Sequence, residues 1–61
     1  MISNTDKLRC VERELGYRRR VFARMVERGK MTERQSQNEI ALMEAILADY
    51  QKLAALEELP L

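Results

Sequence analysis

Hydrophobic residues recur along this chain in two stretches with helical spacing, separated by a short polar break. The first set is Leu8, Val11, Leu15, Phe22, Met25 and Val26, and the second is Ile40, Met43, Leu47, Tyr50 and Ala54. Most steps are of three, four or seven residues, so each set falls on one side of a helix with 3.6 residues per turn. The pattern predicts an all-α chain of two amphipathic helices.

Signals at the helix ends set the expected bounds. The segments Ser3 to Asp6 and Thr32 to Gln35 match the capping box, in which a Ser or Thr precedes an acidic or amide side chain by three residues. Gly29 suits the left-handed position that ends a helix, and Pro60 excludes helix from the residue before it. We predict helices over about 4–28 and about 33–58, joined by a turn at 29–32.

The short connection dictates how the two helices are arranged. Helices of roughly 25 residues, each about 37 Å long, can only fold back on each other when so few residues join them. We therefore predict an antiparallel two-helix hairpin in which residues 1–61 form a single domain. Facing positions should have numbers that add to about 61, which brings Leu15 beside Ile46 and Leu47, and Val11 beside Tyr50.

The second helix carries more hydrophobic surface than one neighbouring helix can cover. Its apolar residues fill an arc of about 160°, against about 100° in the first helix. A monomer of this size would bury only about 60% of the surface that its unfolded chain exposes, so its stability would be marginal. We expect a second copy to cover the surplus in a four-helix bundle, and a groove for another protein's helix is the alternative. The candidate interface residues are Leu42, Ile46, Tyr50 and Leu53, together with Arg18.

Arg18 is included because it falls inside the apolar arc of the first helix. Its guanidinium keeps its charge and needs a partner. Glu14 is four residues earlier, and Glu39 and Glu44 lie near the expected register on the second helix. Two interpretations remain open: an edge arginine whose stem covers apolar surface, or a buried cross-chain ion pair that sets the register of an oligomer.

A second candidate surface comes from the other arginines. The three consecutive ones, Arg18 to Arg20, point in three directions, because neighbouring residues are about 100° apart. A different set converges opposite the hydrophobic face, with Tyr17 among them: Arg9, Arg13, Arg20, Arg24 and Arg28. These are candidate phosphate contacts of a nucleic-acid-binding hairpin. The alternative is a solvated face partly neutralised by Asp6 and Glu27.

The formal net charge of +1 hides an asymmetry between the two halves of the chain. Residues 7–34 carry ten basic and four acidic residues, a net charge of +6, whereas residues 35–61 carry one basic and five acidic residues, a net charge of −4. Either the halves are complementary neighbours in one fold, or the basic half faces an acidic ligand.

Composition argues against catalysis and metal binding. The chain has no histidine and a single cysteine, Cys10, so the usual nucleophile and base pairs, a Cys/His metal cluster and an intrachain disulfide are missing. We expect a non-enzyme without cofactors. One cysteine fits a reducing compartment, and no apolar run reaches the length of a signal peptide core or a membrane span. We therefore expect a cytoplasmic protein without membrane contact.

A family resemblance adds a biological context. The segment Glu12 to Tyr50 contains "REL", "RRRVF", "ERGKMT", "EIALMEAI" and "DY" in that order, over about two thirds of the chain. This pattern resembles a group of short proteins encoded in prophages and phage-like regions of Proteobacteria. The resemblance implies a phage-associated cytoplasmic context, and it implies no site residues because that group has no established activity. The expected function is a homo-oligomeric interaction module, such as an accessory protein of a phage operon; nucleic-acid binding is the alternative.

Overall fold

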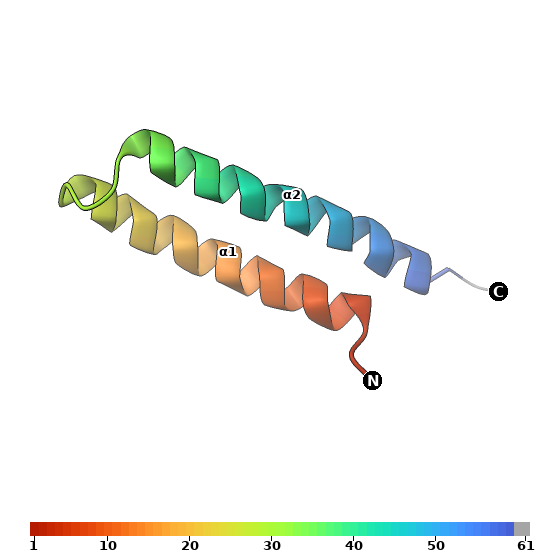
Figure 1. The fold of residues 1–61 in the computed structure, drawn as a ribbon. Helices are drawn as coiled ribbons and strands as arrows, with labels where there is room; N and C mark the ends of the chain where they lie inside the picture. Colours follow the sequence, from red (N-terminus) through yellow and green to blue (C-terminus); the bar gives the residue numbers. More distant parts are fainter. Residues whose placement is uncertain (60–61) are drawn as a thin grey trace.

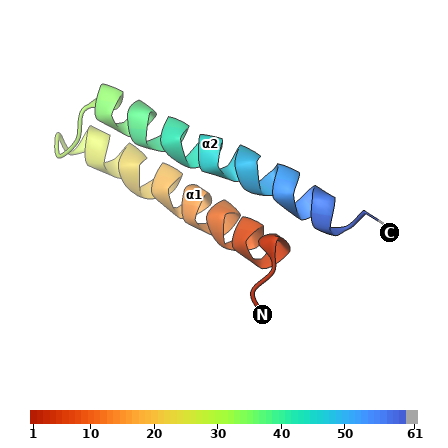
Figure 2. The same ribbon diagram turned by 45° about the vertical axis from the view of Figure 1, so that its right-hand side comes forward.

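The computed structural model describes residues 1–59, which form two helices, α1 (Asn4–Glu27) and α2 (Glu33–Glu57) (Figure 1). The helices lie side by side and run in opposite directions, as two views show (Figures 1 and 2). The predicted all-α hairpin is therefore confirmed. Each helix ends one residue earlier than predicted, because Arg28 and Glu58 are the residues that cap the helix C-termini. The expected effect of Pro60 lies outside the described residues.

Both helices begin at the predicted capping boxes. The backbone N–H of Asp6 donates to the Ser3 hydroxyl oxygen at 3.0 Å, and that of Gln35 donates to the Thr32 hydroxyl oxygen at the same distance. In return, the Gln35 side-chain oxygen accepts from the Thr32 backbone N–H at 2.9 Å. These contacts satisfy N–H groups that have no partner within the helix. Local side chains therefore determine where each helix starts.

The chain reverses at Gly29, in a turn whose backbone N–H groups donate to carbonyls in the last turn of α1. Gly29 has a φ of +71°, in the left-handed region. Its N–H donates to the Val26 carbonyl at 3.1 Å, and the Lys30 N–H donates to the Met25 carbonyl at 2.8 Å. This pair of bonds is the Schellman motif, which terminates a helix. The direction of the chain after α1 is thus set by one glycine.

Polar contacts between the helices show the register of the hairpin. The Asn4 backbone N–H donates to both carboxylate oxygens of Glu57, at 2.9 and 3.0 Å. Closer to the middle of the hairpin, Arg19 Nη2 donates to Glu44 Oε2 at 2.9 Å. Both contacts fit the predicted register, in which facing positions add to about 61. The Glu57 carboxylate also lies at the N-terminus of α1, where the partial positive charge of a helix stabilises an anion.

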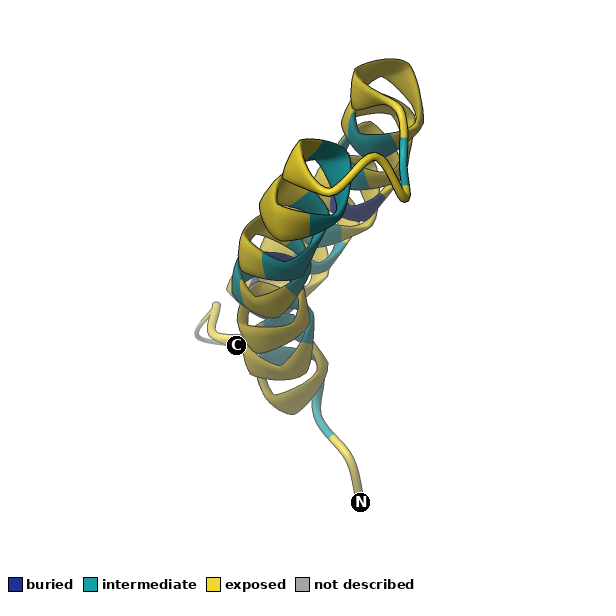
Figure 3. Cartoon of the chain, turned by 90° about the vertical axis from the view of Figure 1, so that its left-hand side faces the viewer, coloured by how far each residue is buried: buried dark blue, intermediate teal, exposed yellow. Residues whose placement is uncertain are grey.

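The core is a single row of contacts between two helices. The described residues extend over 51 × 17 × 13 Å, so the hairpin is about one helix thick in its shortest direction. Within residues 1–59, only Leu15, Met43 and Ala54 are buried. In Figure 3 the buried and intermediate parts of the cartoon lie mostly where the two helices face each other, and exposed parts cover the outer sides. Most of the surface of both helices is therefore open to solvent or to a partner.

The two glycines give opposite predictions for stability. A Cβ at Gly16 would meet only Arg20 Nη1, at an ordinary 3.8 Å, whereas a side chain at Gly29 would be strained by the positive φ. Gly16→Ala should raise the free energy of unfolding by about 0.5–1 kcal/mol, because alanine favours helix more than glycine does. Gly29→Ala should lower it by about 1–2 kcal/mol. Urea unfolding followed by circular dichroism, at one protein concentration, measures both. If both variants changed the free energy of unfolding in the same direction, the different backbone roles given to Gly16 and Gly29 would be wrong.

Candidate interaction surfaces

Exposed aliphatic side chains form a row along one side of α2. The exposed fractions are 60% for Leu42, 42% for Ile46, 42% for Leu53 and 63% for Leu56. Steps of four, seven and three residues place all four within an arc of about 80° on the helix. We call this row the α2 apolar stripe. It contains three of the four α2 residues predicted to form an interface.

The α2 apolar stripe is separate from the face that packs against α1. That face consists of the buried residues Met43 and Ala54 and the half-buried residues Ile40, Leu47 and Tyr50. Its centre lies about 100° around the helix from the centre of the stripe. α2 therefore has two adjacent hydrophobic faces, and the hairpin covers only one of them.

Tyr50, the fourth predicted interface residue on α2, differs from the others. It is half-buried, and Lys7 Nζ lies 5.8 Å from the centroid of its ring. That distance allows a cation–π interaction with the N-terminal end of α1. Tyr50 therefore lies between the hairpin core and the stripe. The fourth exposed residue of the stripe is instead Leu56, three residues beyond Leu53, which is not among the predicted interface residues.

Arg18 pairs within its own helix. Its Nε donates to Glu14 Oε1 at 3.0 Å, and the two side chains are 35% and 47% exposed. Glu44, the alternative partner on α2, contacts Arg19 instead. An exposed pair four residues apart contributes at most about 1 kcal/mol to stability. Within one hairpin, Arg18 is thus the edge arginine of the first interpretation.

Arg18 nevertheless lies on the same side of the hairpin as the α2 apolar stripe. On α1, Arg18 and Arg19 are about 100° apart, with Leu15 between them, so they lie on opposite flanks of the row that faces α2. On α2, Glu44 and Ile46 are about 200° apart, so they too lie on opposite flanks of the face that packs against α1. Because Arg19 bonds to Glu44, these two residues are on one side of the hairpin, and Arg18 and Ile46 are on the other. We call the side with Arg18 and Ile46 the apolar side of the hairpin.

α1 adds two hydrophobic residues to the apolar side. Val21 and Met25 are half-buried, and they follow Glu14 and Arg18 at steps of three and four residues. Val21 was absent from the sequence-based set, although the spacing of four, three and four from Glu14 to Met25 could have identified it. The apolar side therefore draws on both helices, with the Glu14–Arg18 pair beside it.

The predicted arginine stripe lies on the outer face of α1 and its cap. Its members are Arg9, Arg13, Arg20, Arg24 and Arg28, and all are exposed. Among the described residues none of the five forms an ion pair. Asp6 and Glu27, the predicted neutralising residues, form none either; the Asp6 carboxylate accepts from the Ser3 N–H at 3.5 Å. Tyr17, in the middle of the stripe, is 55% exposed. In the described part of the hairpin no ion pair therefore offsets these arginines, and the face keeps an excess of three positive charges over Asp6 and Glu27.

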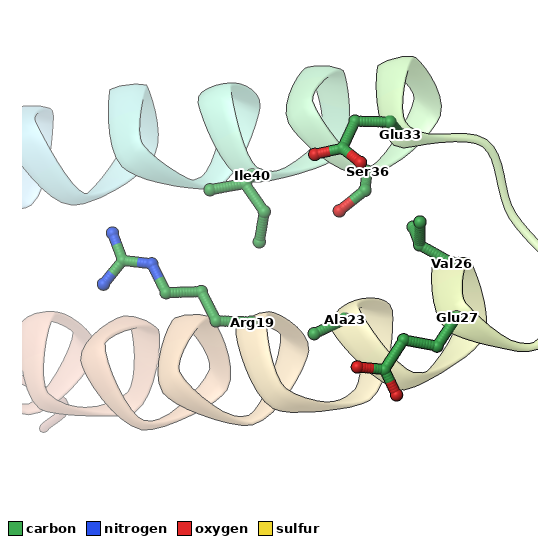
Figure 4. Close-up of a pocket in the computed structure, with 7 residues that line it drawn as sticks. All are labelled: Arg19, Ala23, Val26, Glu27, Glu33, Ser36 and Ile40. Carbon is green, nitrogen blue, oxygen red and sulfur yellow. The ribbon is translucent and has the colours of Figure 1, made fainter.

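A shallow groove of about 350 Å³ lies between the helices near the turn (Figure 4). Ala23 and Ser36 leave it open because their side chains are small, and Arg19 borders it with its guanidinium bonded to Glu44. The residues that line it are Arg19, Ala23, Val26, Glu27, Glu33, Ser36 and Ile40. In the described part of the chain, no group of three or more potential metal ligands is present. Cys10 is exposed and lies outside the groove.

Comparisons with protein-family models, curated proteins and solved structures found no match to this chain. Among the described residues, no helix is long and apolar enough to cross a membrane. The apolar side and the arginine stripe are therefore the surfaces from which a function can be proposed.

Proposed function

We propose that the protein is a non-enzymatic, homo-oligomeric interaction module in which two hairpins pack through their apolar sides into a four-helix bundle. The observation that supports this is the α2 apolar stripe, whose four side chains stay 42–63% exposed after the hairpin has formed. Burying apolar surface is favourable by about 25 cal/mol per Å². A contiguous exposed row of this kind is typical of a protein interface.

Two features favour a second copy as the occupant. First, the apolar side draws on both helices, so two hairpins can bring two pairs of helices together around a common axis, as four-helix bundles do. Second, a hairpin with three buried residues has little core of its own. A second hairpin would turn the single layer into two layers that enclose a core.

Within this dimer, the Glu14–Arg18 pair would select among possible arrangements. The pair borders the surface that becomes buried, and Arg18 is already two-thirds covered in the single hairpin. A dimer that removed the guanidinium from carboxylates and from water would leave an uncompensated charge, which is strongly unfavourable. We infer that Arg18 restricts the hairpins to arrangements in which it keeps an acidic partner.

The biological setting that we propose is the bacterial cytoplasm during a phage life cycle. The resemblance of the segment Glu12 to Tyr50 to prophage-encoded proteins supports the phage context. The single, exposed Cys10 suits a reducing compartment. An accessory protein of a phage operon would act in this setting by assembling, or by occupying the surface of another protein.

The first prediction concerns the α2 apolar stripe. Light scattering across a dilution series should give the mass of a dimer for the wild-type protein. The double variant Ile46→Asp, Leu53→Asp should be monomeric, because two carboxylates would have to be desolvated in the interface. The matched control is Ala41→Asp, Ala48→Asp, which adds the same charge at the same spacing of seven, at exposed positions on roughly the opposite side of α2. The control should remain dimeric.

Circular dichroism on the same samples distinguishes dissociation from unfolding. If the wild-type protein is a folded monomer at every concentration, self-association is wrong, and the apolar side would then suit the helix of another protein. Equal masses for the two double variants would also contradict the proposed interface.

The second prediction concerns Arg18. Arg18→Leu should leave the melting temperature unchanged or higher, because a leucine extends the hydrophobic surface of the apolar side. It should also replace the single dimer mass with a mixture of assemblies, because the arrangement is no longer restricted. Arg19→Leu is the control, since Arg19 lies on the other flank and pairs with Glu44. A single dimer mass for Arg18→Leu would remove the proposed role of Arg18 in specificity.

A further inference from the structure

The arginine stripe concentrates five arginines on one face, and among the described residues the two acidic residues of that face, Asp6 and Glu27, form no ion pair with them. The other two arginines of α1 have acidic partners, Arg18 in Glu14 and Arg19 in Glu44. The five arginines of the stripe have none among the described residues, and all are exposed. From Arg9 to Arg28 they extend over about 28 Å of helix. A row of this length and charge attracts polyanions.

The spacing of the stripe opposes the stability of the helix that carries it. Arg9 and Arg13 are four residues apart, and so are Arg20 and Arg24, and Arg24 and Arg28. Like charges four residues apart destabilise a helix. A face that only kept the protein in solution would be more stable with both signs interspersed, whereas Asp6 and Glu27 lie at the two ends of this face and no acidic residue lies on it between Arg9 and Arg24. The arrangement is therefore better explained by a ligand outside the hairpin than by solubility.

The middle of the stripe contains an aromatic ring and a glycine. Gly16 and Tyr17 lie between Arg13 and Arg20, where the stripe has a step of seven residues without an arginine of its own. The ring of Tyr17 is more than half exposed. The hairpin does not require a glycine at position 16, since a Cβ there would meet only the Arg20 guanidinium at 3.8 Å. Gly16 weakens the helix, and it is half-buried with the Arg20 guanidinium beside it.

We propose that the arginine stripe is a binding surface for single-stranded nucleic acid. The guanidiniums of Arg13, Arg20 and Arg24 bond to successive phosphates, and Tyr17 stacks on a base. Basic tracks interrupted by exposed aromatic rings are how proteins bind single strands without sequence preference. Arginine suits this role because its planar head can donate two hydrogen bonds to one phosphate.

Two other polyanionic surfaces explain the features less well. A duplex keeps its bases stacked and paired, so an exposed Tyr17 would have no base to stack on. An anionic membrane requires a helix that inserts apolar residues between the lipids. The inward row of α1, with Leu15 at its centre, packs against α2, and the exposed α2 apolar stripe is on a different side of the hairpin from the arginines. The single strand is the ligand that uses the charge and the ring together.

This surface is independent of the proposed dimer interface. The stripe lies opposite the face of α1 that packs on α2, whereas the apolar side is a flank of both helices. A dimer would carry two stripes, and a strand long enough to reach both would bind more tightly than to a single stripe. The two proposals can therefore fail separately.

The test is fluorescence anisotropy of labelled oligonucleotides with the full chain. The probes are thymidine and mixed-sequence single strands of about 20 nucleotides and a duplex of the same length, in about 50 to 200 mM salt. We expect single strands to bind more tightly than the duplex, with an affinity that falls steeply as salt increases. The stripe variant Arg13→Glu, Arg20→Glu, Arg24→Glu should bind at least about tenfold more weakly than its control. The control is Lys30→Glu, Arg34→Glu, Lys52→Glu, which changes the net charge equally at exposed positions outside the stripe.

The role of the ring has its own comparison. Tyr17→Ala should weaken single-strand binding by about tenfold or more, whereas Tyr17→Phe, which keeps a stacking surface, should bind within about twofold of the wild-type protein. Circular dichroism and light scattering should show that each variant keeps its helices and its assembly state.

Several outcomes would overturn the proposal. No binding at the lowest salt would exclude a nucleic-acid surface. Equal losses in the stripe variant and in its control would show attraction by net charge alone. Binding to heparin as tight as to single strands, with no effect of Tyr17→Ala, would show a general polyanion surface without base stacking. None of these results would alter the mass measured for the wild-type protein, so they leave self-association to its own test.

Discussion

A helix with a single neighbour can bury only one strip of its surface, and this limit shapes the whole molecule. α2 has two adjacent hydrophobic faces, but α1 can pack against only one, the face with Met43 and Ala54. The described chain provides no third helix, and its thickness of 13 Å leaves a single layer. The exposure of Leu42, Ile46 and Leu53 is therefore a consequence of topology. No change of side-chain conformation within one hairpin could bury them against α1.

With so small a core, the geometry of the hairpin depends on its ends. The Ser3 and Thr32 capping boxes start the helices, and the turn at Gly29 reverses the chain. The Glu57 carboxylate then closes the far end by accepting from the Asn4 N–H. These contacts are short-range or lie at termini, so they define length and register without a large buried interface. They also leave the sides of both helices free for other contacts.

The same distinction explains what the sequence could predict. Capping boxes and a helix-ending glycine act over a few residues, so the fold, the bounds and the register could be inferred closely. Which hydrophobic residues face inwards depends on tertiary packing. Leu15 was expected beside both Ile46 and Leu47, but Leu47 is half-buried while Ile46 is 42% exposed. Neighbours on a helix point about 100° apart, and an apolar arc of about 160° does not reveal its centre. Leu56 lies about 40° beyond Leu42, outside that arc, so the arc does not include it.

The distribution of charge follows from the same hairpin geometry as the exposed hydrophobic surface. The basic and acidic halves of the chain could have neutralised each other across the hairpin, yet only one ion pair, Arg19 to Glu44, joins the helices among the described residues. The geometry explains this, because the arginine stripe lies about 180° from the face of α1 that contacts α2. Side chains on that outer face are too far from α2 to reach its carboxylates. The antiparallel hairpin thus separates the charges that it could have paired, and it presents a basic face without ion pairs to α2 and an uncovered apolar side in different directions.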